Sequence, residues 1–211
     1  MRRKLSTWFI SDTEFATRLS LNSQTLERVE AVKLVGVWVD TWLDWERNTS
    51  EICKKARLTM LTKLKYAGVN TEDLVNIYIL FIRSALEYCS VLWHSTITGD
   101  QAQSIERVQK TCLKVILGNA YKGYADALDY CGLQPLSERR EARCLQFGLK
   151  CLLHPVHHRM FPVNPQLDNE RNTTQSQEHF AVNWARTESY RMSAVPYIQR
   201  KLNEYVRTQK K

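Results

Sequence analysis

Lysine and arginine residues recur at helical spacing in two stretches of this sequence, where their charges can hold a phosphate backbone. In the second stretch, Arg107, Lys110 and Lys114 are three and four residues apart, so they share one side of a helix. Such contacts supply affinity for nucleic acid without reading base sequence. The alternative is an ordinary solvated helix face, which is also rich in charge. The basic residues of the first stretch are Lys54, Lys55, Arg57 and Lys63.

A cluster of cysteine and histidine offers metal-binding chemistry. Cys151, His154 and His157 stand at the short spacings that zinc sites use. The paired cysteines of a zinc knuckle are missing, so we expect core cysteines and a polar helix end, where histidine favours the helix dipole. Cys89 lies five residues before His94, but a free cysteine in an apolar helix is typically a small core residue rather than a nucleophile.

Three tryptophans and one charged pair are the other side chains that could contribute to a site. The tryptophans can stack on bases, but we expect them to close the corner between a strand and a helix. Arg83 and Glu87 are one helical turn apart, which favours a salt bridge on a helix face, with Arg107 or Glu106 of the next helix within reach. The tryptophans are Trp38, Trp42 and Trp45.

The composition is that of an ordinary globular protein with a basic surplus. The chain has 211 residues, 44% of them hydrophobic, which is enough for a core. Its formal net charge of +8 raises the expectation of a nucleic-acid partner. Six cysteines in a chain of this length do not suggest a disulfide framework, and Trp8–Ile10 is too short for a signal-peptide core. We therefore expect an intracellular protein of the nucleus or cytoplasm, not secreted and with no membrane partner.

Periodicity predicts the elements that position these residues, beginning with extended structure over residues 5–40. The run Val32–Val39 has the composition of one strand, and Gly36 inside it suggests a bulge or a close backbone approach. Apolar residues at helical spacing then predict a helix over residues 52–64 that stops at Gly68; its stripe is Ile52, Ala56, Met60 and Leu64.

The following segments predict a helical bundle. Residues 74–92 are apolar on nearly all sides, which predicts a central, enclosed helix capped by Asn70 or Thr71. A helix whose apolar stripe is Ile105, Val108, Cys112 and Ile116 ends at Gly118. Further helices are expected over residues 124–130, from a Ser137 cap to Pro155, and, as a short one, after Pro196. The predicted fold class is mainly α (α+β), with a small N-terminal antiparallel sheet before the helices.

Short blocks with a fixed order extend along nearly the whole chain. The most distinctive are Leu86–His94 and Ile105–Lys110, which we expect to pack as adjoining α-helices. In this order the blocks resemble the C-terminal part of the reverse transcriptase, an RNA-directed DNA polymerase, of non-LTR (jockey-like, LINE-type) retrotransposons. The other blocks are Lys33–Val37, Trp42–Trp45, Ile52–Ala56, Leu136–Arg140, His154–Pro155, Arg186–Arg191 and Ser193–Tyr197.

The resemblance implies a domain order and a partner. The thumb of such an enzyme holds the primer–template, a duplex or RNA–DNA hybrid, along its backbone, beside the remainder of the palm. Lys33, Leu34, Gly36 and Val37 would belong to a primer-grip-like strand, with Lys33 joining the phosphate contacts. The implied ranges are 1–46 for a β-hairpin or strand remnant at the end of the palm, 47–160 for a helical thumb-like domain, 161–181 for a flexible linker and 182–211 for a C-terminal segment with a short helix.

The resemblance does not extend to the catalytic centre. Polymerases of this class hold two Mg²⁺ ions with clustered palm aspartates that include an Ala-Asp-Asp turn, and no Asp-Asp pair occurs in this sequence. We therefore expect a fragment with no cofactor and no polymerase activity of its own. Two alternatives stay open: a self-associating or protein-interaction module with exposed apolar edges, and a genomic relic with no selected role.

Overall fold

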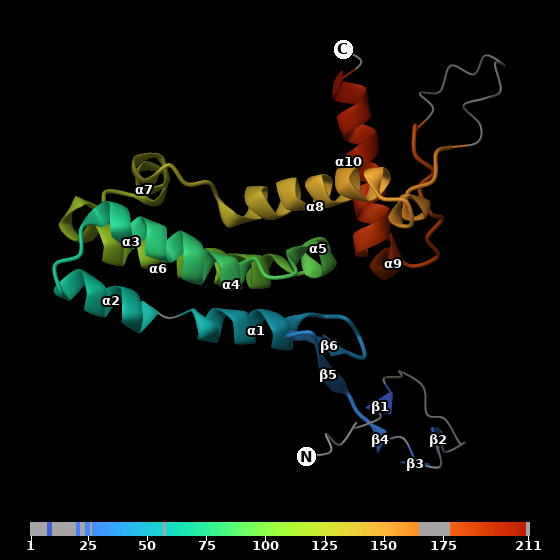
Figure 1. Ribbon diagram of the computed structural model, residues 1–211, viewed down its shortest axis with the longest axis horizontal. Helices are drawn as coiled ribbons and strands as arrows, with labels where there is room; N and C mark the ends of the chain where they lie inside the picture. The colour runs from blue at the N-terminus through green and yellow to red at the C-terminus, as the bar shows by residue number, and fades with distance from the viewer. Residues whose placement is uncertain are drawn as a thin grey trace.

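The computed structural model describes residues 8–9, 20–21, 24–25, 27–56, 58–164 and 178–209, and these are mainly helical (Figure 1). A small antiparallel two-stranded sheet precedes the helices, which confirms the expected fold class. Two shorter pairings come before it. They are β1 (Trp8–Phe9) parallel to β4 (Glu27–Arg28), and β2 (Ser20–Leu21) antiparallel to β3 (Gln24–Thr25).

A hairpin stands where the sequence predicted one strand. Its strands are β5 (Ala31–Leu34) and β6 (Val37–Asp40). Val35 and Gly36 form the two-residue turn, with φ of 47° and 88°. Positive φ at both positions matches the turn to the twist of the strands, and only glycine adopts it without steric cost. The expected close approach is present too, because a Cβ on Gly36 would lie 3.4 Å from Cε1 of Tyr88.

Two helices replace the single helix expected over residues 52–64. They are α1 (Glu46–Lys55) and α2 (Leu58–Tyr66). Ala56 between them is extended, with ψ of 106°, so the helical hydrogen-bond ladder stops there. The break also shifts the buried stripe by one position, because Leu61 rather than Met60 is fully buried.

The apolar segment that follows is a broken helix. Its parts are α3 (Thr71–Ile77), the π-helical stretch η1 (Tyr78–Arg83), α4 (Ser84–Leu86) and α5 (Ser90–Trp93). Asn70 caps α3 as expected, since its side chain accepts a hydrogen bond from Asp73 N at 2.8 Å. Cys89 has φ of 50°, so Leu86–His94 is not the continuous helix that the sequence predicted.

This segment is also less enclosed than expected. Leu74, Tyr78 and Ile82 form a buried stripe at intervals of four residues. On another side, Leu80 is 65% exposed and Phe81 is 63% exposed. Neighbouring helices cover only the buried stripe, so an apolar sequence on all sides did not mean burial on all sides.

The long helix α6 (Gly99–Leu117) contacts α1, α2, α3, α7 (Tyr124–Cys131) and α8 (Leu136–Leu153). Ile105, Cys112 and Ile116 are fully buried, as their spacing predicted. Gly118, with φ of 54°, ends the helix as expected and begins the short helix η2 (Gly118–Ala120). The main core therefore lies between α6 and the helices around it.

A second core lies at the C-terminal end of the molecule, where α10 crosses α8 (Figure 1). Its helices are α8 (Leu136–Leu153) and α10 (Ala194–Gln209), and the short helices η3 (His157–Met160) and α9 (Glu188–Met192) contact them from outside the core. Ser137 does not cap α8; instead Leu136 N donates to the Glu106 carboxylate at 3.2 Å. The expected short helix after Pro196 is a 16-residue helix with Pro196 in its first turn, where the missing N–H does no harm.

Both ends of the expected linker, residues 161–164 and 178–181, pair with each other and contribute to this second core. Asn164 N donates to His179 O and Ala181 N donates to Pro162 O, both at 2.9 Å. Beside them, the side chains of Phe161 and Phe180 are buried. Residues 165–177 lie outside the described part, and the four domain ranges stay predictions.

Candidate nucleic-acid interface

The basic stripe of α6 is the best-defined cationic surface of the chain. Arg107, Lys110 and Lys114 are exposed on the side opposite the buried stripe. Within the described residues, none of the three forms an ion pair. Nζ of Lys110 lies 4.8 Å from the ring centroid of Tyr124, and Nζ of Lys114 lies 5.6 Å from that of Tyr121. These rings position the charges without neutralising them.

The one acidic neighbour on this part of α6 is engaged elsewhere. Glu106 accepts hydrogen bonds from the Tyr124 hydroxyl and from Leu136 N at the start of α8. Burial, together with this hydrogen bond to Glu106, raises the pKa of Tyr124, which therefore stays a donor. The carboxylate thus caps a helix and does not cancel the charge of the stripe.

A buried polar contact fixes the rotation of α6. Gln109 is fully buried, and its Oε1 accepts from the Tyr78 hydroxyl. Its Nε2 donates to the Tyr124 hydroxyl at 2.7 Å and to Gln134 O at 3.1 Å. At the N-terminus, Thr98 and Gln101 form a reciprocal capping box. Because Gln109 can make these bonds in only one orientation, the basic stripe must face solvent.

The predicted residues of the first basic stretch are divided between two helices. Lys54 and Lys63 line one shallow pocket with Met60 and Leu64, and Lys54 is 3.4 Å from Oε1 of Glu51. Lys55 is exposed at the end of α1, and Arg57 lies outside the described residues. The break at Ala56 therefore separates these lysines, which do not form one continuous helical stripe.

The hairpin adds a cation–aromatic contact that the sequence did not reveal. Lys33 lies across the strands from Trp38, with Nζ 5.8 Å from its ring centroid. Cζ of Arg47 lies 3.6 Å from the same ring. Because Arg47 is nine residues away on α1, neither spacing nor periodicity could connect it to Trp38. In the primer-grip-like strand, Leu34 and Gly36 are exposed and Val37 is buried; that role stays a prediction.

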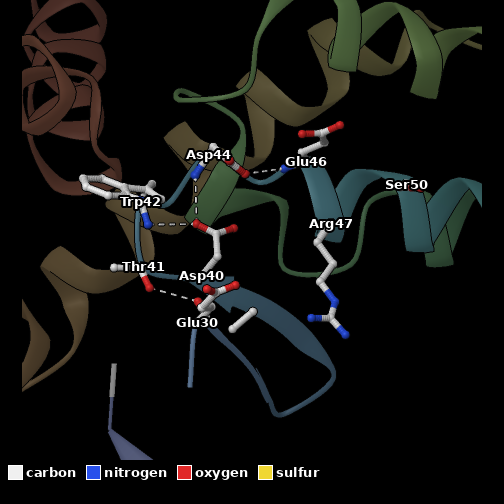
Figure 2. Close-up of a pocket in the computed structure, with 9 residues that line it drawn as sticks. Glu30, Asp40, Thr41, Trp42, Asp44, Glu46, Arg47 and Ser50 are labelled. Carbon is white, nitrogen blue, oxygen red and sulfur yellow. Dashed lines mark hydrogen bonds between the residues drawn. The ribbon is translucent and has the colours of Figure 1, made fainter. Parts of the chain in front are cut away.

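The other two tryptophans differ in exposure. Trp45 is buried in the main core, as the packing interpretation predicted, whereas Trp42 is 72% exposed. Trp42 lines a pocket whose other walls carry several carboxylates (Figure 2). Asp40 Oδ1 accepts from Trp42 N at 3.1 Å and from Asp44 N at 3.2 Å. These carboxylates stabilise the turn from hairpin to helix, and the negative pocket is no phosphate site.

The side chains of Cys151, His154 and His157 do not come together to form a metal site. Cys151 is buried in the second core, while His154 Nδ1 accepts from Val156 N at 3.2 Å and from His157 N at 3.3 Å. Across the described part of the chain, no group of three or more His, Cys, Asp or Glu is placed to hold a metal ion. Cys89 and His94 share no hydrogen bond; His94 instead lies against Arg140.

The expected salt bridge between Arg83 and Glu87 is wrong, because Glu87 pairs with other arginines. Glu87 is buried and pairs with α8: Arg139 Nε lies 2.8 Å from Oε1, and Arg143 Nη2 lies 3.2 Å from Oε2. The turn at Glu87–Cys89 directs the carboxylate away from its own helix and toward α8. Glu106 and Arg107 take no part in this ion pair.

No family model, curated protein or solved structure matches the chain. Among the described residues, none of the helices has the length and apolarity to cross a bilayer.

Proposed function

We propose that this chain binds the sugar–phosphate backbone of a nucleic-acid duplex or RNA–DNA hybrid, as a thumb-type region of a non-LTR-type reverse transcriptase does. The observation that carries the proposal is the α6 stripe, in which three neighbouring cations face solvent and pair with no carboxylate of the described residues. Unpaired cations on a fixed helix suit phosphate contact, because no ion pair must break first.

The family assignment rests on the block order of the sequence and on part of the geometry. Ile105–Lys110 is helical and carries the stripe, and Leu86 and Trp93 bury in the same core as Ile105. The broken helix at Leu86–His94 departs from the pattern that we expected. The catalytic step of a polymerase is not part of the proposal, because it needs palm aspartates that this sequence does not contain.

The test is binding of a fluorescent, blunt RNA–DNA hybrid by fluorescence anisotropy. Replacing Arg107, Lys110 and Lys114 together by Gln should weaken binding by about 10-fold or more at moderate salt. The matched control replaces Arg191, Arg200 and Arg207 by Gln, which removes the same charge from α9 and α10. Equal losses in the two variants would mean that only net charge matters and would contradict a site on α6.

A second candidate function is self-association or binding of another protein. The observation that favours it is the exposed apolar surface of Leu80 and Phe81, with Val35 of the hairpin turn 87% exposed. Sedimentation of the wild-type chain against a Leu80→Ser, Phe81→Ser variant tests it. A concentration-dependent dimer that the variant abolishes would support this function.

A further inference from the structure

A pocket beside the break between α4 and α5 brings cationic and aromatic side chains of α8 together. On α8, Arg143, Phe147 and Lys150 are spaced by four and three residues, so they share one side of the helix. Arg143 and Lys150 are exposed, and Phe147 between them is 38% exposed. The residues that line the pocket include Glu87, Cys89, Ser90, Arg143, Phe147 and Lys150.

The charge around Glu87 is unbalanced. Arg139 already holds both carboxylate oxygens, with Nε at 2.8 Å from Oε1 and Nη2 at 3.3 Å from Oε2. Arg143 reaches the same carboxylate through one nitrogen at 3.2 Å, and 44% of its side chain stays exposed. Burial and the charge of Arg139 hold the pKa of Arg83 below its ordinary value, so positive charge is crowded here. One carboxylate thus pairs with two guanidinium groups, and Arg83 adds a third positive charge nearby.

The excess positive charge lies beside the pocket, where it can bind an anion. The unused N–H groups of Arg143 can donate to a phosphate oxygen. Lys150 forms no ion pair within the described part of the chain and lies two helical turns away. The Phe147 ring between these cations can stack on a base only if that base is unpaired.

We propose that this pocket binds a nucleotide of a single strand, with its phosphates on Arg143 and Lys150 and its base on Phe147. The site is distinct from the α6 stripe, which takes the backbone of a duplex and reads no base. The inference rests on the proposed function, because it assumes that the chain meets nucleic acid.

The experiment compares three fluorescent hybrids: a blunt one, one with a single-stranded overhang of about six nucleotides, and one whose overhang has the same length but no bases. We expect the overhang with bases to bind more tightly than the other two. Phe147→Leu should weaken binding of that ligand by about 5- to 100-fold and leave the other two unchanged, while Phe147→Trp should retain it. Tyr205→Leu is the control, since Tyr205 is 37% exposed on α10; thermal unfolding midpoints confirm that each variant is folded.

The outcomes separate the two proposals. Tight binding of the blunt hybrid with no gain from the overhang would overturn the pocket and leave the α6 stripe standing. Binding of the overhang without binding of the blunt hybrid would overturn the α6 stripe and leave the pocket standing. Loss of affinity for all three ligands in Phe147→Leu would reduce Phe147 to a packing residue. Displacement of the overhang by an acidic peptide at equal concentration would assign the pocket to a protein partner, against the proposal.

Discussion

The cations of α6 and two arginines of α8, Arg139 and Arg140, are used in opposite ways. On α6, Arg107, Lys110 and Lys114 point to solvent and have no carboxylate partner among the described residues. On α8, Arg139 pairs with the buried Glu87, and Arg140 is fully buried, with Nε 3.4 Å from His94 Nδ1. The difference lies in what surrounds each helix, because both carry a similar number of basic residues.

The comparison teaches that charge is available to a ligand only where folding does not already use it. Removing a partner from a buried ion pair leaves a desolvated charge, which destabilises the fold. Removing an exposed, unpaired lysine costs the fold almost nothing. Variants of the buried Glu87 ion pair should therefore change the free energy of unfolding, and variants of the α6 stripe should change binding alone.

The largest effect on stability is expected from Glu87→Ala. It leaves Arg139 and Arg143 beside a cavity without their counter-charge, and it should lower the free energy of unfolding by about 2–3 kcal/mol. The loss is smaller than for a fully buried ion pair because the Arg143 side chain is partly exposed. Urea denaturation measures it, with Glu51→Ala of the exposed Lys54 pair as control, for which we expect less than about 0.5 kcal/mol. Similar losses for the two variants would contradict the contrast between buried, paired charges and exposed ones.

The close crossing of α8 and α10 should give the next largest effect. A Cβ on Gly148 would lie 2.6 Å from Cγ2 of Ile198, so Gly148→Ala should destabilise by about 1–3 kcal/mol. Gly99→Ala, in the first turn of α6, meets no atom within 4 Å and should be neutral or slightly stabilising. Thermal unfolding of both variants checks the difference, and a neutral Gly148→Ala would mean that α10 does not pack here.

A pH dependence should arise at His94, between α8 and α10. Burial, and then the charge of Arg140, lower its pKa from 6.5 to about 4. The unfolded chain therefore takes up this proton first, and stability that is complete above pH 6.5 should decline as the pH falls toward 4. We expect a loss of about 1–2 kcal/mol, discounted for partial exposure. His94→Gln should flatten this part of the curve; an unchanged curve would refute the assignment to His94.

The smallest effect on stability is expected from the triple replacement of Arg107, Lys110 and Lys114 by Gln. Exposed side chains without ion pairs contribute little to folding, so the free energy of unfolding should change by less than about 0.5 kcal/mol. Urea denaturation checks this value. A loss of several kcal/mol would show that the stripe is structural and would remove the contrast with α8.

The sequence predicted the helices whose signals are local. Asn70 caps α3, Gly118 ends α6, and the spacing of Ile105, Cys112 and Ile116 gave the buried side of α6 correctly. These features depend on residues within one or two helical turns. For the same reason the direction of the α6 stripe could be predicted before its surroundings were known.

The wrong predictions share one cause: tertiary contacts determine these features, and the sequence does not show them. Nothing near Ala56 marks the break between α1 and α2, and the positive φ of Cys89 has no glycine signal. Glu87 was assigned to Arg83 because helical spacing predicts neighbours on the same helix, yet its partners lie more than 50 residues away. The contact of Arg47 with Trp38 and the pocket at Phe147 likewise join elements that the sequence could not bring together.

The most direct test is the salt dependence of binding to a blunt RNA–DNA hybrid. If three phosphates bind to α6 and about two more to the lysines of α1 and α2, the logarithm of the affinity should fall against the logarithm of salt concentration with a slope of about −4 to −5. Replacing the three α6 cations by Gln should reduce the steepness of that slope by about 3, and the charge-matched variant of α9 and α10 should keep it. A slope near zero for the wild-type chain, or equal slopes for the two variants, would contradict a phosphate-binding face on α6.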